Sequence, residues 1–170
     1  MMRLLGAALV VAGCGALGMA GVARLDGRTR DLGELAAGLD ALQRELGWRL
    51  APLPQALDTA AKAVRGPAAG LFARCAQQAR APDGQSFQQV WQDSLSAAPL
   101  RLTAADRVLL ERLGPVLGRY DGESQRLALE DAAAGLRQLQ GEAADDRKRL
   151  GRVYGVLGMT AGLFLAIVLL

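Results

Sequence analysis

Few side chains in this sequence could carry out covalent, acid–base or metal chemistry. The chain contains no histidine, which removes the usual general base and the commonest metal ligand. Its two cysteines, Cys14 and Cys75, are too few for a zinc site or a disulfide framework. The adjacent carboxylates Glu130–Asp131 and Asp145–Asp146 diverge on a helix and cannot share one site. We therefore expect no catalytic, cofactor-binding or metal-binding residues, and a protein that is not an enzyme.

The charged residues leave both ends of the 170-residue chain apolar. Residues 4–23 and residues 153–170 contain no charged side chain. At about 1.5 Å per residue, helices of this length are about 27–30 Å long, close to the hydrocarbon thickness of a bilayer. We therefore predict transmembrane helices at 1–23 and 153–170, with a polar domain at 24–152 between them.

Basic residues gather on the inner side of both predicted spans. Arg24, Arg28 and Arg30 follow the first span, and a basic cluster at 147–152 precedes the second. The positive-inside rule therefore predicts a two-pass protein of the cell membrane whose central domain is cytoplasmic. An alternative stays open, because Val-Ala-Gly-Cys at 11–14 looks like a bacterial lipobox. Processing at Cys14 would instead give a lipid-anchored extracytoplasmic structural protein.

Leucine spacing and prolines divide the central domain into helices. Leucines at positions 32, 35, 39, 42 and 46 form one apolar stripe, which predicts a helix that continues out of the first span. Shorter helices are predicted at 54–65, from 67 to about 80, from 86 to about 96, and from 103 to about 117, where Gly114–Pro115 could break the last one. Ser86 with Gln89, and Thr103 with Asp106, have the spacing of helix caps.

The end of the chain completes an all-α fold. Asp121 is a suitable N-cap, and no proline follows it, so one helix is predicted from about 122 to 170. The fold expected is a bundle of about six helices, in which two long antiparallel helices continue into the N- and C-terminal spans. Trp91 fits the core of this bundle by its helical spacing, whereas Trp48 is equally compatible with the core and with a docking surface.

Small residues form a nearly continuous face on each predicted span. These residues are Ala8, Ala12, Ala16 and Ala20 in the first span, and Gly151, Gly155, Gly158 and Gly162 at the second. Small faces let helices pack closely in lipid, so the spans can pack on each other, on a partner or on a second copy of the chain. A nucleic-acid partner is not expected, since the net charge is only +3 and both signs are interleaved.

Three stretches of the sequence, together with the two-span layout, resemble a known family. They are Leu42–Leu46 running into Pro-Leu-Pro-Gln-Ala-Leu at 52–57, the segment from Leu113-Gly114 to Gln125, and Tyr-Gly-Val-Leu-Gly at 154–158 with Gly162-Leu163. Over essentially its full length, the chain is similar to the stage III sporulation protein AB family of endospore-forming bacteria.

The resemblance implies a membrane protein of the mother cell, within the secretion-like complex that joins mother cell and forespore. It implies a helical domain similar to the cytoplasmic domain of the F component, the platform protein of type II secretion. By that analogy the partners would be a secretion-type ATPase, stage III sporulation protein AA, and the other AA–AH proteins. Fold-level analogy supports the fold more strongly than the mechanism.

A platform or adaptor of this kind would bind its partner at the end of the cytoplasmic domain far from the spans. Two turns are expected there, one at 52–54 and one at 118–121. The candidate partner-binding residues are Trp48, Pro52, Leu53, Pro54, Gly118, Asp121 and Gln125. The same turns are also expected if they only cap and end the helices, so the sequence leaves both interpretations open.

Overall fold

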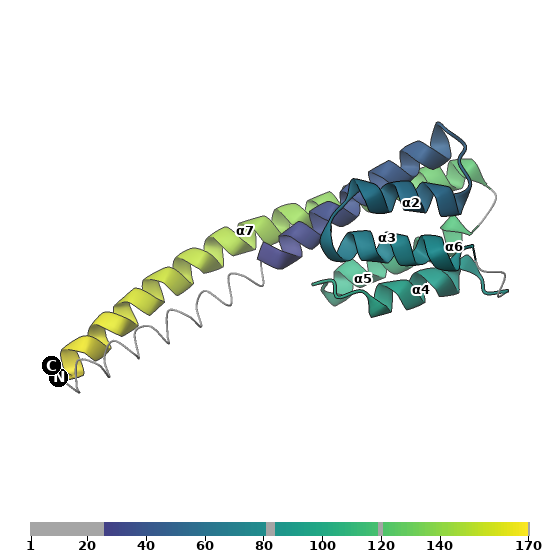
Figure 1. The fold of residues 1–170 in the computed structure, drawn as a ribbon. Coiled ribbons are helices and arrows are strands. Elements are labelled where there is room, and N and C mark those ends of the chain that lie inside the picture. Colours follow the sequence, from purple (N-terminus) through teal and green to yellow (C-terminus); the bar gives the residue numbers. More distant parts are fainter. Residues whose placement is uncertain (1–25, 81–83, 119–120, 170) are drawn as a thin grey trace. The chain divides into compact units, whose positions relative to one another are not determined.

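The computed structural model describes the backbone of residues 26–80, 84–118 and 121–169, and the side chains of these ranges except 150–159 and 161–169. The chain divides into two compact units, one made of Arg28–Gly141 and the other of Met1–Gly27 with Glu142–Leu170. All regular structure in the described ranges is helical (Figure 1), which confirms the predicted all-α fold for that part of the chain.

Two long helices frame the unit Arg28–Gly141. The first is helical over the described residues 26–47, and α7 spans Gly122–Leu169. The leucines at positions 32, 35, 39 and 42 of the predicted stripe are fully buried, so this stripe is the core-facing side of the first helix.

Contacts between these two helices show their relative direction within the unit. Asp40 forms an ion pair with Arg137, and Gly33, one heptad earlier, lies against the side chain of Gln140. As residue numbers increase along the first helix, the residue numbers of its contacts in α7 decrease. The two helices are antiparallel here, as the sequence predicts.

Prolines set the starts of α2 (Leu53–Ala63) and α3 (Gly66–Gln78). Each helix has a proline in its first turn, where the missing N–H would have no helical partner. The helix α2 ends before the predicted Arg65, because Val64 is extended and buried. The backbone N–H of Arg65 instead donates to the carboxylate of Glu34 at 2.8 Å.

Capping residues set the starts of α4 (Phe87–Ala97) and α5 (Ala104–Glu111). Ser86 and Gln89 form a complete capping box, and so do Thr103 and Asp106, as predicted from their spacing. The break expected at Gly114–Pro115 is also present. Residues Gly114–Leu117 form a separate short helix, α6.

Trp91 lies in the core between α3, α4 and α5. Its side chain is fully buried, and its ring centroid lies 6.3 Å from that of Phe72. The indole Nε1 donates to the backbone carbonyl of Leu110 at 2.8 Å, which also accepts the backbone N–H of Leu113 at 3.1 Å near the end of α5. The prediction that Trp91 belongs to the core is confirmed.

A charged face of the first helix fixes the segment that leads into α5. Arg28 donates from Nε and Nη2 to the two carboxylate oxygens of Asp106, each at 2.9 Å, and Asp106 is fully buried. Asp31, also buried, accepts the backbone N–H of Arg101 at 2.9 Å. These bonds join residues more than 65 positions apart and attach the α4–α5 connection to the first helix.

The unit Met1–Gly27 with Glu142–Leu170 contains the end of α7, and Asp26 pairs there with Arg147 at 2.5 Å. Across the described side chains, no helix combines the length and the apolar character needed to cross a bilayer. The side chains of the predicted spans at 1–23 and 153–170, except that of Thr160, are not among those described. The same holds for the small-residue faces predicted at 8–20 and 151–162. Both spans therefore stay predictions.

Candidate functional site

A cavity of about 800 Å³ opens within the unit Arg28–Gly141, and we call it the groove. It is lined by residues from the end of the first helix, the loop into α2, α3, the start of α4, α6 and α7. The lining residues are Leu46, Leu50, Ala51, Pro52, Leu53, Pro54, Gln78, Ala79, Gln85, Phe87, Val90, Leu117, Gly118 and Gln125.

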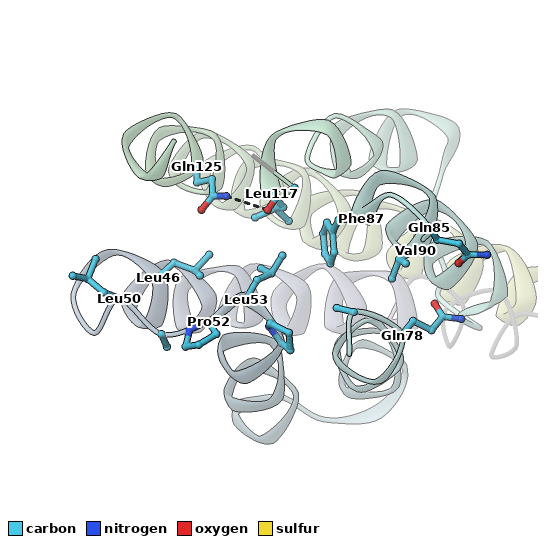
Figure 2. Close-up of a pocket in the computed structure, with 14 residues that line it drawn as sticks. Leu46, Leu50, Pro52, Leu53, Gln78, Gln85, Phe87, Val90, Leu117 and Gln125 are labelled. Atoms are coloured by element: carbon cyan, nitrogen blue, oxygen red, sulfur yellow. Dashed lines mark hydrogen bonds between the residues drawn. The ribbon is translucent and has the colours of Figure 1, made fainter. Parts of the chain in front are cut away.

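The groove has two apolar walls (Figure 2). Leu46 and Leu53 project from one wall toward the opposite wall, which carries Leu117 and Phe87. Leu50 lies at one end of the groove, whereas Gln78 and Gln85 lie at the other end. Leu46, Leu53 and Phe87 are half-buried in the groove, whereas Leu117 and Val90 are buried and belong to the core.

Among the lining residues that the structure describes, none is charged, and the polar side chains are three glutamines. Gln125 donates from Nε2 to the carbonyl of Leu117 at 3.0 Å, which links the start of α7 to the end of α6. Gln78 accepts from the hydroxyl of Ser94 at 3.1 Å. An uncharged lining disfavours a charged ligand, because an ion would lose its hydration without gaining a partner. The described lining therefore suits an apolar group better than an ion.

The structure brings the two predicted turns together at this groove. Pro52, Leu53 and Pro54 from the first turn line it, and so do Gly118 from the second turn and Gln125 from α7, although more than 60 positions separate the turns. The close approach at Gly118 leaves little space, since an added Cβ would lie 3.2 Å from Cβ of Phe87. Whether these residues bind a partner stays a prediction.

Asp121 does not line the groove, and it has a local task at the start of α7. Its carboxylate accepts the hydroxyl of Ser124, and its backbone carbonyl accepts the N–H of Gln125 at 3.1 Å. Hydrogen bonds from the Ser124 side chain and from the backbone N–H groups of Ser124 and Glu123 hold the pKa of Asp121 below its usual value. This arrangement is that of the N-cap predicted for Asp121.

Trp48 also lies outside the groove lining, and it is one of the most exposed apolar residues described. Its side chain is 88% exposed, so Trp48 is not a core residue. Leu50, two positions later, is 82% exposed and has a backbone φ of 50°. Sequence reasoning could not select Leu50, because a left-handed leucine has no signature in composition or periodicity.

Sequence reasoning also missed Leu46, Gln85 and Phe87. Leu46 is the last leucine of the stripe. It lies beyond the four fully buried leucines of that stripe and is half-buried in the groove. Phe87 is the first residue of α4, so its side chain lies at an end of the core rather than within it. For Leu46 and Phe87, the available signal was their position at the end of an amphipathic helix; Gln85, in the segment before α4, had none.

The described residues offer no obvious chemistry of their own. Among them, no group of three or more His, Cys, Asp or Glu residues could hold a metal ion. Cys75 is fully buried on α3, and burial raises the pKa of its thiol to about 11. A neutral, inaccessible thiol is a poor nucleophile, and Cys75 serves as a core residue of α3.

Comparison with known proteins decides the family. The family model described as stage III sporulation protein AB (spore_III_AB) matches residues 3–170. The chain belongs to the stage III sporulation protein AB family. Stage III sporulation protein AB of Bacillus subtilis (strain 168) is 28% identical over 177 residues, which cover 100% of both chains.

A solved structure of stage III sporulation protein AB shares the fold. It superimposes with a TM-score of 0.66 at 26% identity, and the match covers 72% of this chain and 98% of that chain. Membership in the stage III sporulation protein AB family gives the chain a role in stage III of sporulation, as a component of a complex with other proteins. The resemblance seen in the sequence is confirmed.

Proposed function

We propose that the chain is a non-enzymatic platform or adaptor of the sporulation complex, which couples a cytoplasmic ATPase to the membrane assembly. The partner would be the secretion-type ATPase stage III sporulation protein AA, together with the other AA–AH proteins. The predicted spans at 1–23 and 153–170 would hold the chain in the mother-cell membrane, with 24–152 in the cytoplasm. The resemblance to the F component of type II secretion supports this assignment by analogy.

The groove is the observation that carries the proposal. Soluble domains rarely leave contiguous apolar surface open to water unless another molecule covers it. Here half-buried apolar side chains, a described lining without a charged residue and two turns from distant parts of the sequence meet in one groove. Such a groove can receive an apolar segment of a partner, and no catalytic group accompanies it in the described lining.

The position of the groove along the two long helices suits mechanical coupling. The first helix ends at the groove, and α7 begins beside it with Gln125. In the sequence, the same two helices lead to the two predicted spans. A partner bound in the groove would therefore contact the ends of both helices, and the packed core between them would transmit its displacement.

A carboxylate placed in the groove should weaken binding of the ATPase. Gln85 is an exposed lining residue, so Gln85→Glu leaves the fold intact while the bound partner would have to bury the new charge. We expect the Kd for the purified ATPase, measured with the full chain in nanodiscs, to rise at least about tenfold, or about 1.4 kcal/mol.

The matched control is Gln92→Glu, which adds the same charge at an exposed position of α4 outside the groove. Its Kd should equal that of the wild type. If Gln85→Glu binds the ATPase as tightly as Gln92→Glu does, the groove is not the binding site.

Thiol labelling should place the central domain in the cytoplasm. Ser96 is exposed on α4, whereas Cys75 is buried and protonated, so Ser96→Cys in a Cys14→Ser background offers one reactive thiol. A membrane-impermeant maleimide should label it only after the cells are lysed. Labelling in intact cells would contradict the platform and favour the extracytoplasmic, lipid-anchored alternative.

A further inference from the structure

Another cavity, of about 540 Å³, lies at the start of α3, and we call it the arginine pocket. Its volume is within the range of about 300–1,000 Å³ that small-molecule sites occupy. It shares no lining residue with the groove, since α3 begins at this pocket with Gly66 and ends at the groove with Gln78. The charged side chains in its lining are those of Arg30, Arg65, Arg101, Asp31 and Glu34.

Two carboxylates on the first helix bring the three arginines together. Asp31, which is buried, accepts the backbone N–H of Arg101 at 2.9 Å. Glu34, one turn later, accepts the backbone N–H of Arg65 at 2.8 Å. These bonds hold the main chains of Arg65 and Arg101 beside the helix turn that carries Arg30, although at least 35 positions separate any two of these arginines.

The three arginines of the pocket have charges that no described side chain compensates in an ion pair. All three are exposed, and none of them forms an ion pair within the described part of the chain. The two carboxylates of the pocket bond to backbone N–H groups instead. Three positive and two negative side chains leave the lining with a net charge of +1. An anion bound among the guanidinium groups would remove their mutual repulsion, so the pocket favours an anionic ligand.

We propose that the arginine pocket binds a phosphate group, carried either by an anionic phospholipid or by a soluble compound. The guanidinium group is a planar, permanently charged fork that donates paired hydrogen bonds to phosphate oxygens. A phosphate has more oxygens than a carboxylate, so it can accept from three guanidinium groups that come from three segments of the chain. This inference is independent of the ATPase proposed above.

The position of Arg30 in the sequence favours the lipid as the source of the phosphate. Arg30 follows residue 23, the end of the first predicted span, by seven positions. Seven residues reach at most about 25 Å even when they are fully extended, so the predicted span would keep Arg30 near the membrane surface. The cytoplasmic leaflet contains anionic phospholipids, which attract basic residues close to it.

Thermal unfolding of the full chain in micelles of an uncharged detergent tests the pocket, with the fluorescence of the buried Trp91 as the signal. Sodium phosphate should raise the Tm by at least about 2 °C relative to sodium chloride of the same ionic strength, because a ligand that binds only the folded state stabilises it. Phosphatidylglycerol in the micelles should raise the Tm at least as much, relative to phosphatidylcholine. The triple variant Arg30→Gln, Arg65→Gln and Arg101→Gln should lose both shifts.

The matched control is the triple variant Arg44→Gln, Arg74→Gln and Arg112→Gln. It removes the same charge from exposed positions on the first helix, on α3 and directly after α5, all outside the pocket, and it should keep both shifts. A shift with phosphatidylglycerol assigns the phosphate to a lipid headgroup, whereas a shift with inorganic phosphate alone assigns it to a soluble compound. The proposal is overturned if neither addition raises the Tm of the wild type, or if the two triple variants respond alike. Neither result changes the expected Kd for the ATPase, so the proposed function stands or falls separately.

Discussion

Replacing Asp106 with alanine is expected to lower the free energy of unfolding by about 3–5 kcal/mol. The Asp106 carboxylate is fully buried and accepts two bonds from the Arg28 guanidinium at 2.9 Å and one from the backbone N–H of Thr103 at 2.8 Å. Its removal takes the Asp106 ion pair away from a mostly buried guanidinium and removes half of the α5 capping box. Urea unfolding followed by circular dichroism measures the loss.

The pH dependence of unfolding tests the same pair without relying on the size of that loss. Burial alone would raise the pKa of Asp106, but the hydrogen bonds from Arg28 and Thr103 outweigh it and hold the pKa below the usual value. A carboxyl whose folded pKa is lowered adds stability above its unfolded pKa, and this stability is lost as the pH falls through the folded pKa. The wild type should therefore lose this increment in acid, and Asp106→Ala should not show it.

Asp93→Ala is the matched control, because Asp93 is an exposed aspartate on α4. It should change the free energy of unfolding by less than about 0.5 kcal/mol. A loss at Asp106 no larger than the loss at Asp93 would show that the Arg28–Asp106 pair does not hold α5 to the first helix.

Alanine at Gly38 is expected to destabilise the bundle by about 2–3 kcal/mol, although alanine is the better helix former. An added Cβ on this face of the first helix would lie 2.7 Å from Cζ of Phe72 and closer still to Cε2. Phe72 is fully buried, and its rigid ring packs near Trp91, so it cannot move aside without disturbing the core. Thermal and urea unfolding should both register the loss.

The same substitution at Gly70 is expected to have the opposite effect on the free energy of unfolding. It lies within α3, and an added Cβ would meet nothing within 4 Å. Gly70→Ala should therefore raise the free energy of unfolding by about 0.5–1 kcal/mol, since it only reduces the entropy of the unfolded chain. Equal effects at Gly38 and Gly70 would contradict the close packing of the first helix on Phe72.

Much of the secondary structure follows from the sequence alone. The spacing of Ser86 with Gln89 and of Thr103 with Asp106 predicted two capping boxes, and the prolines predicted the starts of α2 and α3. The leucine stripe predicted the buried face of the first helix. These predictions succeed because each depends on atoms three or four residues apart, whose separation a helix fixes by itself.

The tertiary structure decided the rest. Three pairings depend on how helices pack across long loops: Arg28 with Asp106, Gly38 with Phe72, and the turn at 52–54 with the turn at 118–121 in one groove. No local periodicity encodes such pairings, because the same amphipathic helices could pack at several rotations and registers. Sequence reasoning could therefore propose both turns as candidates, but it could not bring them together or find the strained Leu50 beside them.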